Sequence, residues 1–407
     1  MPVRARDGVG QGKAMHDRAA ASIVGGASTG SKRVEALYGG TAPSGPTHYR
    51  EAHGCTVVAS DGVSYIDCTM ALGSVALGYA DAGVTLRVVD AVRSGNVAAW
   101  SPVLEMEVAE RLCAVIPCGE RVRFLKTGAE AVAAAVRIAR TATGRSRVVG
   151  CGYFGWLDWS SDARGVPDGV RGDYQRVAFD DLAGLEAAVA GSHDDLAAII
   201  IEPVVERLPS NAWVQRARDL CDRAGAVLIF DEVKTAFRLR TGGYQSLTGI
   251  LPDVCTVGKA LANGFPLSAV VGRDAVMDAA RATWISSTLA SETSALAAAA
   301  AVLERHQQGD VCAVLARTGS AMRGVVQAAL EASGCSGAAL EGIDTMWMIR
   351  FSDEADQARF TTAALREQVI FKRGAYNFAA LAHDDRAIAR IGQAAHAGFA
   401  ALPRHIA

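Results

Sequence analysis

The sequence lacks an excess of charge of either sign and any long hydrophobic run. Its 407 residues carry 41 Lys and Arg against 43 Asp and Glu, which gives a formal net charge of −2 at pH 7. Such a balance provides no electrostatic field that would attract nucleic acid or an anionic membrane. No apolar stretch reaches the roughly 18 residues of a membrane span without a charge or a glycine. We therefore expect neither nucleic acid nor a membrane as a partner.

Motifs for metal ions and disulfides are also lacking. The nine cysteines are scattered and odd in number, and the sequence has no C-x-x-C and no H-E-x-x-H. This pattern argues against a disulfide framework and a zinc site, and it is typical of a reduced compartment. The first residues, MPVRARDGVGQGKAMHDR, contain no hydrophobic signal-peptide core. We expect a cytoplasmic protein with no bound metal.

What the sequence does have is a large apolar fraction in alternating patterns. Half of the residues are hydrophobic, enough for a large core. From about residue 104, short β-rich runs alternate with helical patterns, which predicts a parallel α/β sheet. The expected organisation is a flexible tail at 1–32, a first part of a small domain at 33–90, a large domain at 91–310 and the rest of the small domain at 311–407.

Individual segments have patterns that predict particular strands and helices. Residues 55–68 are predicted to form two strands around a turn at Asp61-Gly62. Amphipathic or alanine-rich patterns predict helices over 104–116, 129–143 and 294–306. Strands are predicted over 122–127, 147–151, 196–203, 226–232, 254–259, 268–272, 346–351 and 369–374.

The stretch GCGYFG, residues 150–155, has the G-x-G-x-x-G spacing of a dinucleotide-binding turn. That turn requires a helix directly after the glycines, because the pyrophosphate binds at the N-terminus of this helix. Here WLDWSSDARGVPDGVRGD follows, and its glycines and proline break any long helix. The aromatic residues of this segment instead offer a face for a flat ring. We expect a ring-binding loop and keep the nicotinamide interpretation as an alternative.

Lysine is scarce, and Lys259 lies between two apolar strands beside Gly258 and Gly264. An ammonium group in such a place loses hydration, which lowers its pKa and frees the amine as a nucleophile. Equally, the stem could pack while the head reaches solvent. This window alone does not separate the two interpretations.

Carboxylates at strand ends bear on that choice. The apolar run AVLIF leads into Asp231, and LAAIII leads into Glu202. The carboxyl ends of parallel strands are where α/β sheets hold ligands. Asp231 and Val233 should share one face and Glu232 the other. Asp231 and Val233 could then hold the nitrogen and the plane of a pyridine ring, although an isolated strand-end aspartate is often a metal ligand or a helix cap.

A third element is KTGAEAV, where a strand ends and a helix begins. Thr127 could cap that helix, and the free amides at the helix start could also bind a phosphate. An amine nucleophile, an acid for a ring nitrogen, an aromatic loop and a phosphate turn together describe pyridoxal 5′-phosphate (PLP) chemistry.

With these parts in order, the sequence resembles the class III (fold type I) PLP aminotransferases, most closely their glutamate-1-semialdehyde 2,1-aminomutase-like branch. The resemblance rests on LIFDEVKTAFR and PDVCTVGKALANGFPLSAVVG, supported by FLKTGAEA and GYFGWLDW. It implies an α/β large domain with a mainly parallel seven-stranded sheet and a smaller α+β domain built from both termini. It also implies a homodimer with the active site at the subunit interface.

The resemblance further implies a role for each site residue. Lys259 would form the Schiff base, and Asp231 would bind the pyridinium nitrogen. Val233 would lie beneath the ring and Tyr153 above it. The phosphate would be held by a turn and by a residue of the neighbouring subunit; these are Thr127, Gly128, Ala129 and, from the neighbour, Thr288.

Several positions depart from the family pattern. Phe154 replaces a usual histidine beside the ring, and Ala129 lacks the hydroxyl of a usual threonine. Lys234 stands where relatives carry methionine or glutamine; it could stabilise the phenolic oxygen of the ring, bind an acidic substrate, or point outward. The arginine that binds the substrate carboxylate in aminomutases has no match, and Arg50 and Arg238 are expected on the surface.

The activity expected from this resemblance is transfer of an amino group from an amino-acid donor to a small aldehyde, ketone or keto-sugar, in biosynthesis. The alternative within PLP chemistry is an intramolecular aminomutase of the glutamate-1-semialdehyde type. Two further alternatives are a nicotinamide oxidoreductase that uses GCGYFG and a protein of the PLP fold without turnover.

Overall fold

The structure, a computed structural model, describes residues 8–403 and contains two compact units. Unit 1 joins the two ends of the chain, up to Asp81 and from Val314 onward, and unit 2 runs from Ala82 to Ala313. The boundaries lie after residues 81 and 313, where the sequence suggested 90 and 310. One α+β unit built from both ends of the chain and one larger α/β unit are the predicted architecture.

Unit 2 is built on a seven-stranded sheet with the order β4-β10-β9-β8-β7-β5-β6. Strand β10 is antiparallel to β4 and β9, and the other pairs are parallel. The mainly parallel seven-stranded sheet is thereby confirmed. Its strands are β4 (Arg121–Leu125), β5 (Arg147–Cys151), β6 (Tyr174–Arg176), β7 (Leu196–Ile201), β8 (Val227–Asp231), β9 (Val254–Val257) and β10 (Ser268–Gly272).

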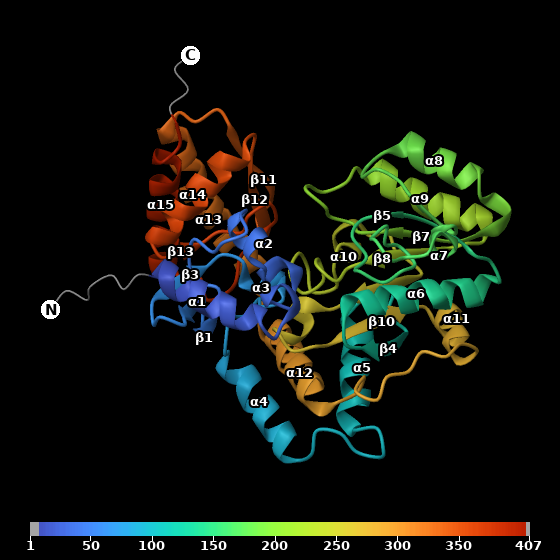
Figure 1. Cartoon of the computed structure of the whole chain (residues 1–407). Helices are drawn as coiled ribbons and strands as arrows, with labels where there is room; N and C mark the ends of the chain where they lie inside the picture. Colours follow the sequence, from blue (N-terminus) through green and yellow to red (C-terminus); the bar gives the residue numbers. More distant parts are fainter. Residues whose placement is uncertain (1–7, 404–407) are drawn as a thin grey trace. The chain divides into compact units, whose positions relative to one another are not determined.

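Helices cover both faces of this sheet (Figure 1). Helix α6 (Gly128–Thr143) packs on one face, where it contacts β7, β8, β9 and β10, and α8 (Leu182–Ala190) and α9 (Asn211–Ala224) pack on the other. The remaining helices of the unit are α4 (Ala82–Arg93), α5 (Val103–Val115), α7 (Asp168–Arg171), α10 (Gln245–Thr248), α11 (Asp274–Met277) and α12 (Thr293–Gln308).

The central strands are apolar throughout because both faces of the sheet are buried. Val148, Ala198, Ile200 and Ile229 belong to the buried cluster that includes α6. Their neighbours along each strand, such as Leu228, are buried as well. Strands buried on both faces read as continuous hydrophobic runs, as parallel sheets require.

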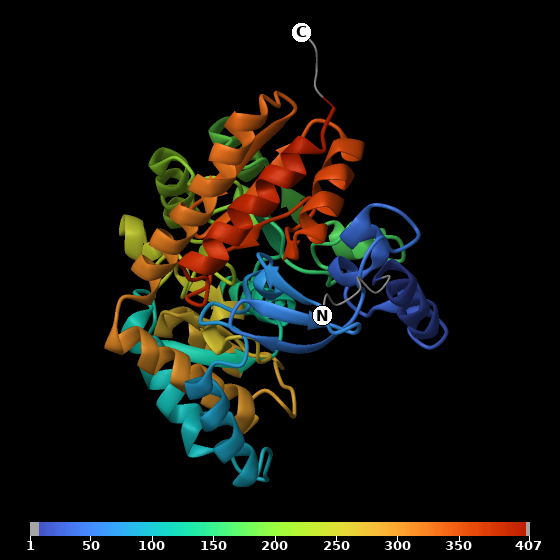
Figure 2. The same cartoon turned by 90° about the vertical axis from the view of Figure 1, so that its left-hand side faces the viewer.

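Unit 1 contains two small sheets, β1-β2-β3-β13 and β11-β12-β14. Figure 2 shows the orange-to-red helices of this unit side by side. The strands are β1 (Tyr49–His53), β2 (Thr56–Ala59), β3 (Ser64–Asp67), β11 (Ala338–Ile343), β12 (Met346–Phe351), β13 (Val369–Ile370) and β14 (Asn377–Phe378). The helices are α1 (Gly8–Ala20), α2 (Val34–Tyr38), α3 (Met70–Gly73), α13 (Val311–Ser333), α14 (Glu354–Arg366) and α15 (Asp385–Ala400).

The predicted hairpin in this unit is confirmed, since β2 and β3 pair antiparallel around Gly62, whose φ is +86°. The strand predicted over 369–374 is shorter than expected. It ends at Ile370, because the amide of Lys372 is bonded to the side chain of Asn377 (2.8 Å) rather than to a neighbouring strand.

The segment expected to be a flexible tail, 1–32, contains α1, and residues 1–7 of that segment lie outside the described range. Gly12 lies against Gly45: a Cβ at position 12 would lie 2.2 Å from the Gly45 carbonyl oxygen. Thr47 also donates a 3.2 Å hydrogen bond to the carbonyl of Gly12. Glycine permits this close approach, and α1 is packed on unit 1 for that reason. Over residues 8–403, no helix has the length and apolar character needed to cross a membrane.

Candidate active site

Three of the predicted residues lie at the carboxyl ends of adjacent central strands. Parallel pairing places Ile201 of β7 opposite Phe230 of β8, so the next residues, Glu202 and Asp231, are neighbours across the sheet. Asp231 in turn pairs with Thr256 of β9, and Lys259 follows three residues later. This edge is where parallel sheets present ligand-binding groups.

Asp231 is buried and held from one side of its carboxyl group. Its Oδ1 accepts hydrogen bonds from the backbone amide of Val233 (3.1 Å) and from Thr256 Oγ1 (2.9 Å). Burial, together with the negative charge of Glu202, raises the pKa of Asp231 to about 7; the two hydrogen bonds and Lys259 oppose this. A cationic ligand would stabilise the ionised form, because an opposite charge lowers the pKa of a carboxyl.

Glu232 has a different role. Its carboxylate accepts hydrogen bonds from the amides of Tyr244 (2.8 Å) and Gln245 (3.1 Å), and from Thr235 Oγ1. These bonds tie the turn after β8 to the start of α10. The separation of the two side chains expected from strand alternation is therefore observed, and the carboxylate of Glu232 has a structural role.

Lys259 lies at the start of a short 3₁₀ turn, Lys259–Ala262, with φ of +47°. A non-glycine residue in the left-handed region is strained, and such strain concentrates at functional sites. Burial around its ammonium group lowers the pKa of Lys259, and the positive charges of Lys234 and Arg238 lower it further; Glu202 and Asp231 act in the opposite direction. A lowered pKa increases the fraction of free amine, the form that attacks a carbonyl.

The predicted phosphate turn is the N-terminus of α6. Thr127 caps this helix: its Oγ1 accepts the Glu130 amide (3.2 Å), and the Glu130 carboxylate accepts the Thr127 amide (2.8 Å). The side chain of Thr127 is therefore a helix cap, while the first amides of the helix point along its axis, where an anion binds. Gly128 lies against Val233, since a Cβ at position 128 would be 3.0 Å from Val233 Cγ1. The turn and the residue expected beneath the ring are thus neighbours.

The glycines of GCGYFG are required by packing. A Cβ at Gly152 (φ +142°) would lie 2.5 Å from the Cβ of Glu202, and one at Gly155 (φ +91°) would lie 2.4 Å from the Cβ of Ala129. No helix follows directly, because the next one is the four-residue α7. The expectation that no long helix follows these glycines is confirmed. The loop follows β5 and packs against Glu202, next to the end of β7, and against Ala129 of the predicted phosphate turn.

This packing yields a prediction with a matched control. Gly155→Ala should weaken PLP binding about tenfold or more, because the new methyl group displaces the turn at Ala129 and a 1 Å error at a binding group is costly. Gly165 has a similar φ of +98°, but a Cβ at that position would have no heavy atom within 4 Å. Gly165→Ala therefore carries only the backbone strain.

Cofactor titration of both variants, followed by absorbance, separates packing from strain. Equal losses of affinity in the two variants would show that contact with Ala129 does not shape the phosphate turn.

The aromatic residues of the loop divide into two groups. Tyr153 is 74% exposed, so its ring is available to a ligand. Phe154 is buried instead and stacks on Trp159, with 5.7 Å between ring centroids, while Tyr174 packs edge-on against both. Phe154 therefore belongs to the core beneath the loop.

Two expectations about cationic residues need correction. Lys234 does not point outward: its Nζ lies 2.5 Å from Glu202 Oε1, and both side chains are almost fully buried. Arg238, expected on the surface, has no exposed area, and burial lowers its pKa to about 10. Both lie in the turn after β8, which folds back into the unit and is not exposed. Arg50 is exposed, as expected.

Thr288 is exposed. The segment that contains it ends at Glu292, whose carboxylate caps α12 and forms a 2.7 Å ion pair with Lys126, the residue between β4 and the predicted phosphate turn. Sequence reasoning missed this ion pair, since nothing in the local patterns links residues 166 positions apart.

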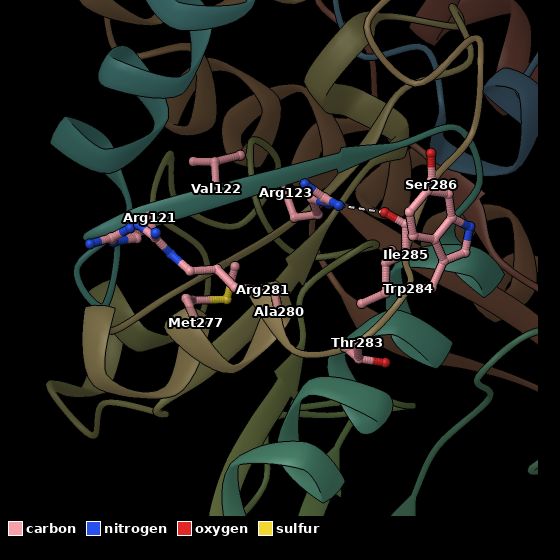
Figure 3. Close-up of a pocket in the computed structure, with 10 residues that line it drawn as sticks. All are labelled: Arg121, Val122, Arg123, Met277, Ala280, Arg281, Thr283, Trp284, Ile285 and Ser286. Carbon is pink, nitrogen blue, oxygen red and sulfur yellow. Dashed lines mark hydrogen bonds between the residues drawn. The ribbon is translucent and has the colours of Figure 1, made fainter.

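A pocket lies beside β4, and some of the residues that line it, 283–286, precede Thr288 in the chain (Figure 3). Its arginines are engaged within the protein: Arg123 donates to the Ile285 carbonyl (2.5 Å), Arg121 pairs with Asp274, and Arg281 pairs with Asp278 (2.7 Å). The predicted site residues do not line it. The bond from Arg123 holds the backbone at Ile285, three residues before Thr288.

This sheet edge, with an amine, an acid and a phosphate turn, is that of a PLP-dependent enzyme of fold type I. The Aminotransferase class-III family matches residues 40–155 and 168–381, and the chain belongs to this family. It is 36% identical to the 2′-deamino-2′-hydroxyneamine transaminase of Streptomyces kanamyceticus over 79% of this chain and 82% of that one. It is 35% identical to the glutamate-1-semialdehyde 2,1-aminomutase of Symbiobacterium thermophilum over 65% of each.

Solved structures of proteins that bind PLP have a similar fold. The FumI protein of Sphingopyxis sp. MTA144, in a PLP form, has a TM-score of 0.91 at 25% identity, covering 96% of both chains. A transaminase with PLP bound has a TM-score of 0.87 at 25% identity, over 96% and 97%. The protein is thus a class III, PLP-dependent aminotransferase. The residues present fit this cofactor, because Gly128 and Gly155 leave room only for the backbone at the phosphate turn and Asp231 receives its hydrogen bonds on one oxygen.

Proposed function

We propose that the enzyme moves an amino group from an amino-acid donor to the carbonyl of a small aldehyde, ketone or keto-sugar in a biosynthetic route. The observation that carries this proposal is the placement of Lys259, Asp231 and the phosphate turn around one sheet edge. The similarity to a transaminase named for an aminoglycoside intermediate supports a sugar-like acceptor.

Each residue has a distinct task in this proposal. Bound PLP supplies an electron-accepting ring. Lys259 would hold the cofactor and carry a proton to and from the substrate carbon. Asp231 would keep the ring nitrogen protonated, and Val233 and Tyr153 would contact the two faces of the ring. The phosphate would be bound by the amides of Gly128 and Ala129, with the helix start fixed by Thr127, and the proposed accessory groups are Glu202 and Lys234.

The amino-group balance tests this proposal. With an amino-acid donor and no acceptor, the PLP-loaded enzyme should convert in one turnover to the aminated cofactor and release one equivalent of keto acid. A diode-array spectrum and a keto-acid assay report both events. An aminomutase of the type found among the relatives would instead turn over one substrate and release no keto acid. If no donor in a broad panel reacts, the proposal fails.

We also propose a homodimer in which Thr288 reaches the phosphate of the neighbouring subunit. Large apolar side chains of unit 2 are exposed in the single chain, including Trp100 (88%), Trp284 (83%) and Val103 (68%). Such exposure is typical of an interaction surface. A solution mass equal to one chain, measured by light scattering at assay concentrations, would contradict this. The nine free thiols support a cytoplasmic location, which localisation of a tagged chain would test.

A further inference from the structure

The most unusual feature near the proposed cofactor site is the buried ion pair between Lys234 and Glu202. The two side chains are 8% and 11% exposed, and Nζ lies 2.5 Å from Oε1. Taking two charges out of water costs several kcal/mol for each ion, and an apolar pair of similar size is often as stable. Stability alone therefore does not account for this pair.

Glu202 also holds the backbone of the ring-binding loop. Its second oxygen, Oε2, accepts a 3.0 Å hydrogen bond from the amide of Tyr153. Gly152 approaches so closely that a Cβ there would lie 2.5 Å from the Cβ of Glu202. The orientation of the Glu202 carboxylate thus sets the position of Tyr153.

The charges of the pair act on both reacting groups. Strand pairing places Glu202 beside Asp231, and its negative charge raises the pKa of that carboxyl. At Lys259, Glu202 raises the pKa and Lys234 lowers it. The other charged groups that act on Lys259 are Asp231 and Arg238. Without Lys234, the carboxylate of Glu202 would be an uncompensated negative charge in a buried site.

We infer that Lys234 and Glu202 are positioning residues of the amino-transfer site, and that their ion pair fixes the Tyr153 loop while cancelling the charge of Glu202 at Lys259. The inference rests on the proposed function of Lys259. It assigns Lys234 a role within the protein, through Glu202, rather than contact with an acidic substrate.

The test uses three variants: Lys234→Met, Glu202→Gln and the double variant. In the cofactor-free protein, Lys259 is acetylated with trace acetic anhydride across pH 6–10, and its rate is compared by mass spectrometry with that of Lys13, which is 63% exposed. Lys234→Met should lower the acetylation rate of Lys259 about tenfold at pH 7.5, since a rise of one pKa unit lowers the free-amine fraction about tenfold. Glu202→Gln should speed it, and the double variant should return to within about threefold of wild type.

A second readout is the pH at which the visible absorbance of PLP-loaded protein changes, which should rise in Lys234→Met and fall in Glu202→Gln. Lys234→Arg keeps the charge and should retain the wild-type profiles, and the shifts expected in Glu202→Gln carry the test if Lys234→Met does not fold. Wild-type profiles in both single variants, or a double variant that keeps the full shift of either single variant, would overturn the inference. Borohydride reduction that labels another lysine would instead overturn the proposed function and leave the acetylation results standing.

Discussion

Lys259→Ala is expected to abolish amino transfer, with kcat lowered about 10³-fold or more, because in the proposed mechanism this amine both holds the cofactor and moves the proton. The chain has five other lysines, of which Lys234 is buried in the same site. Reduction of wild-type enzyme with borohydride should fix the cofactor to the peptide that contains Lys259, and the variant should yield no such peptide.

Lys372→Ala provides a control for the loss of a partly buried lysine, since Lys372 belongs to unit 1. It should leave the labelled peptide unchanged. Substantial residual transfer by Lys259→Ala, or labelling of Lys234 in wild-type enzyme, would show that the nucleophile has been assigned wrongly.

Asp231→Asn should reduce kcat about 10²- to 10³-fold, a loss typical of removing one electrostatic contact that matters in the transition state. The amide has nearly the same shape and can keep the contacts with Val233 and Thr256, but it cannot hold the ring nitrogen protonated. Single-turnover rates with a good donor measure the loss. A variant with wild-type rates would remove Asp231 from the mechanism.

The same variant has a predicted effect on the cofactor-free protein. The pKa of Asp231 is raised from 3.8 to about 7 on folding. Because the pKa is raised in the folded state, the free energy of unfolding of the wild-type protein is highest below pH 3.8 and falls as the pH rises toward 7. Asn cannot ionise, so Asp231→Asn does not show this fall. The free energy of unfolding of the variant relative to wild type should therefore rise by up to about 4 kcal/mol between pH 4 and pH 7 and then stay level. Denaturant titrations at several pH values measure this gain, and a constant difference would show that Asp231 does not titrate as described.

Local patterns were enough to predict the central sheet, because strands buried on both faces leave long apolar runs in the sequence. They also identified the strand-end acids and the helix cap at Thr127, whose partners lie within a few residues. The roles of Lys234 and Arg238 were beyond such patterns. Whether a cation after a strand points to solvent depends on the path of the following turn, and that path is fixed here by the carboxylate of Glu232.

Phe154 shows a similar limit. Its burial in the core could not be predicted, because its packing partners, Trp159 and Tyr174, come together with it only in the folded loop. The ion pair between Lys126 and Glu292 likewise depends on the tertiary fold. In each case the missing information is a contact between segments that are distant in sequence.

The close fit of the glycine loop has a practical consequence for changing substrate range. Positions 152 and 155 cannot accept a side chain without moving Glu202 or Ala129, so mutant libraries that include them should be dominated by inactive clones. Trp156, which is 74% exposed and follows Gly155, can vary in size. Engineering for new acceptors should therefore randomise position 156, keep Tyr153 for its proposed contact with the ring, and leave the loop backbone intact.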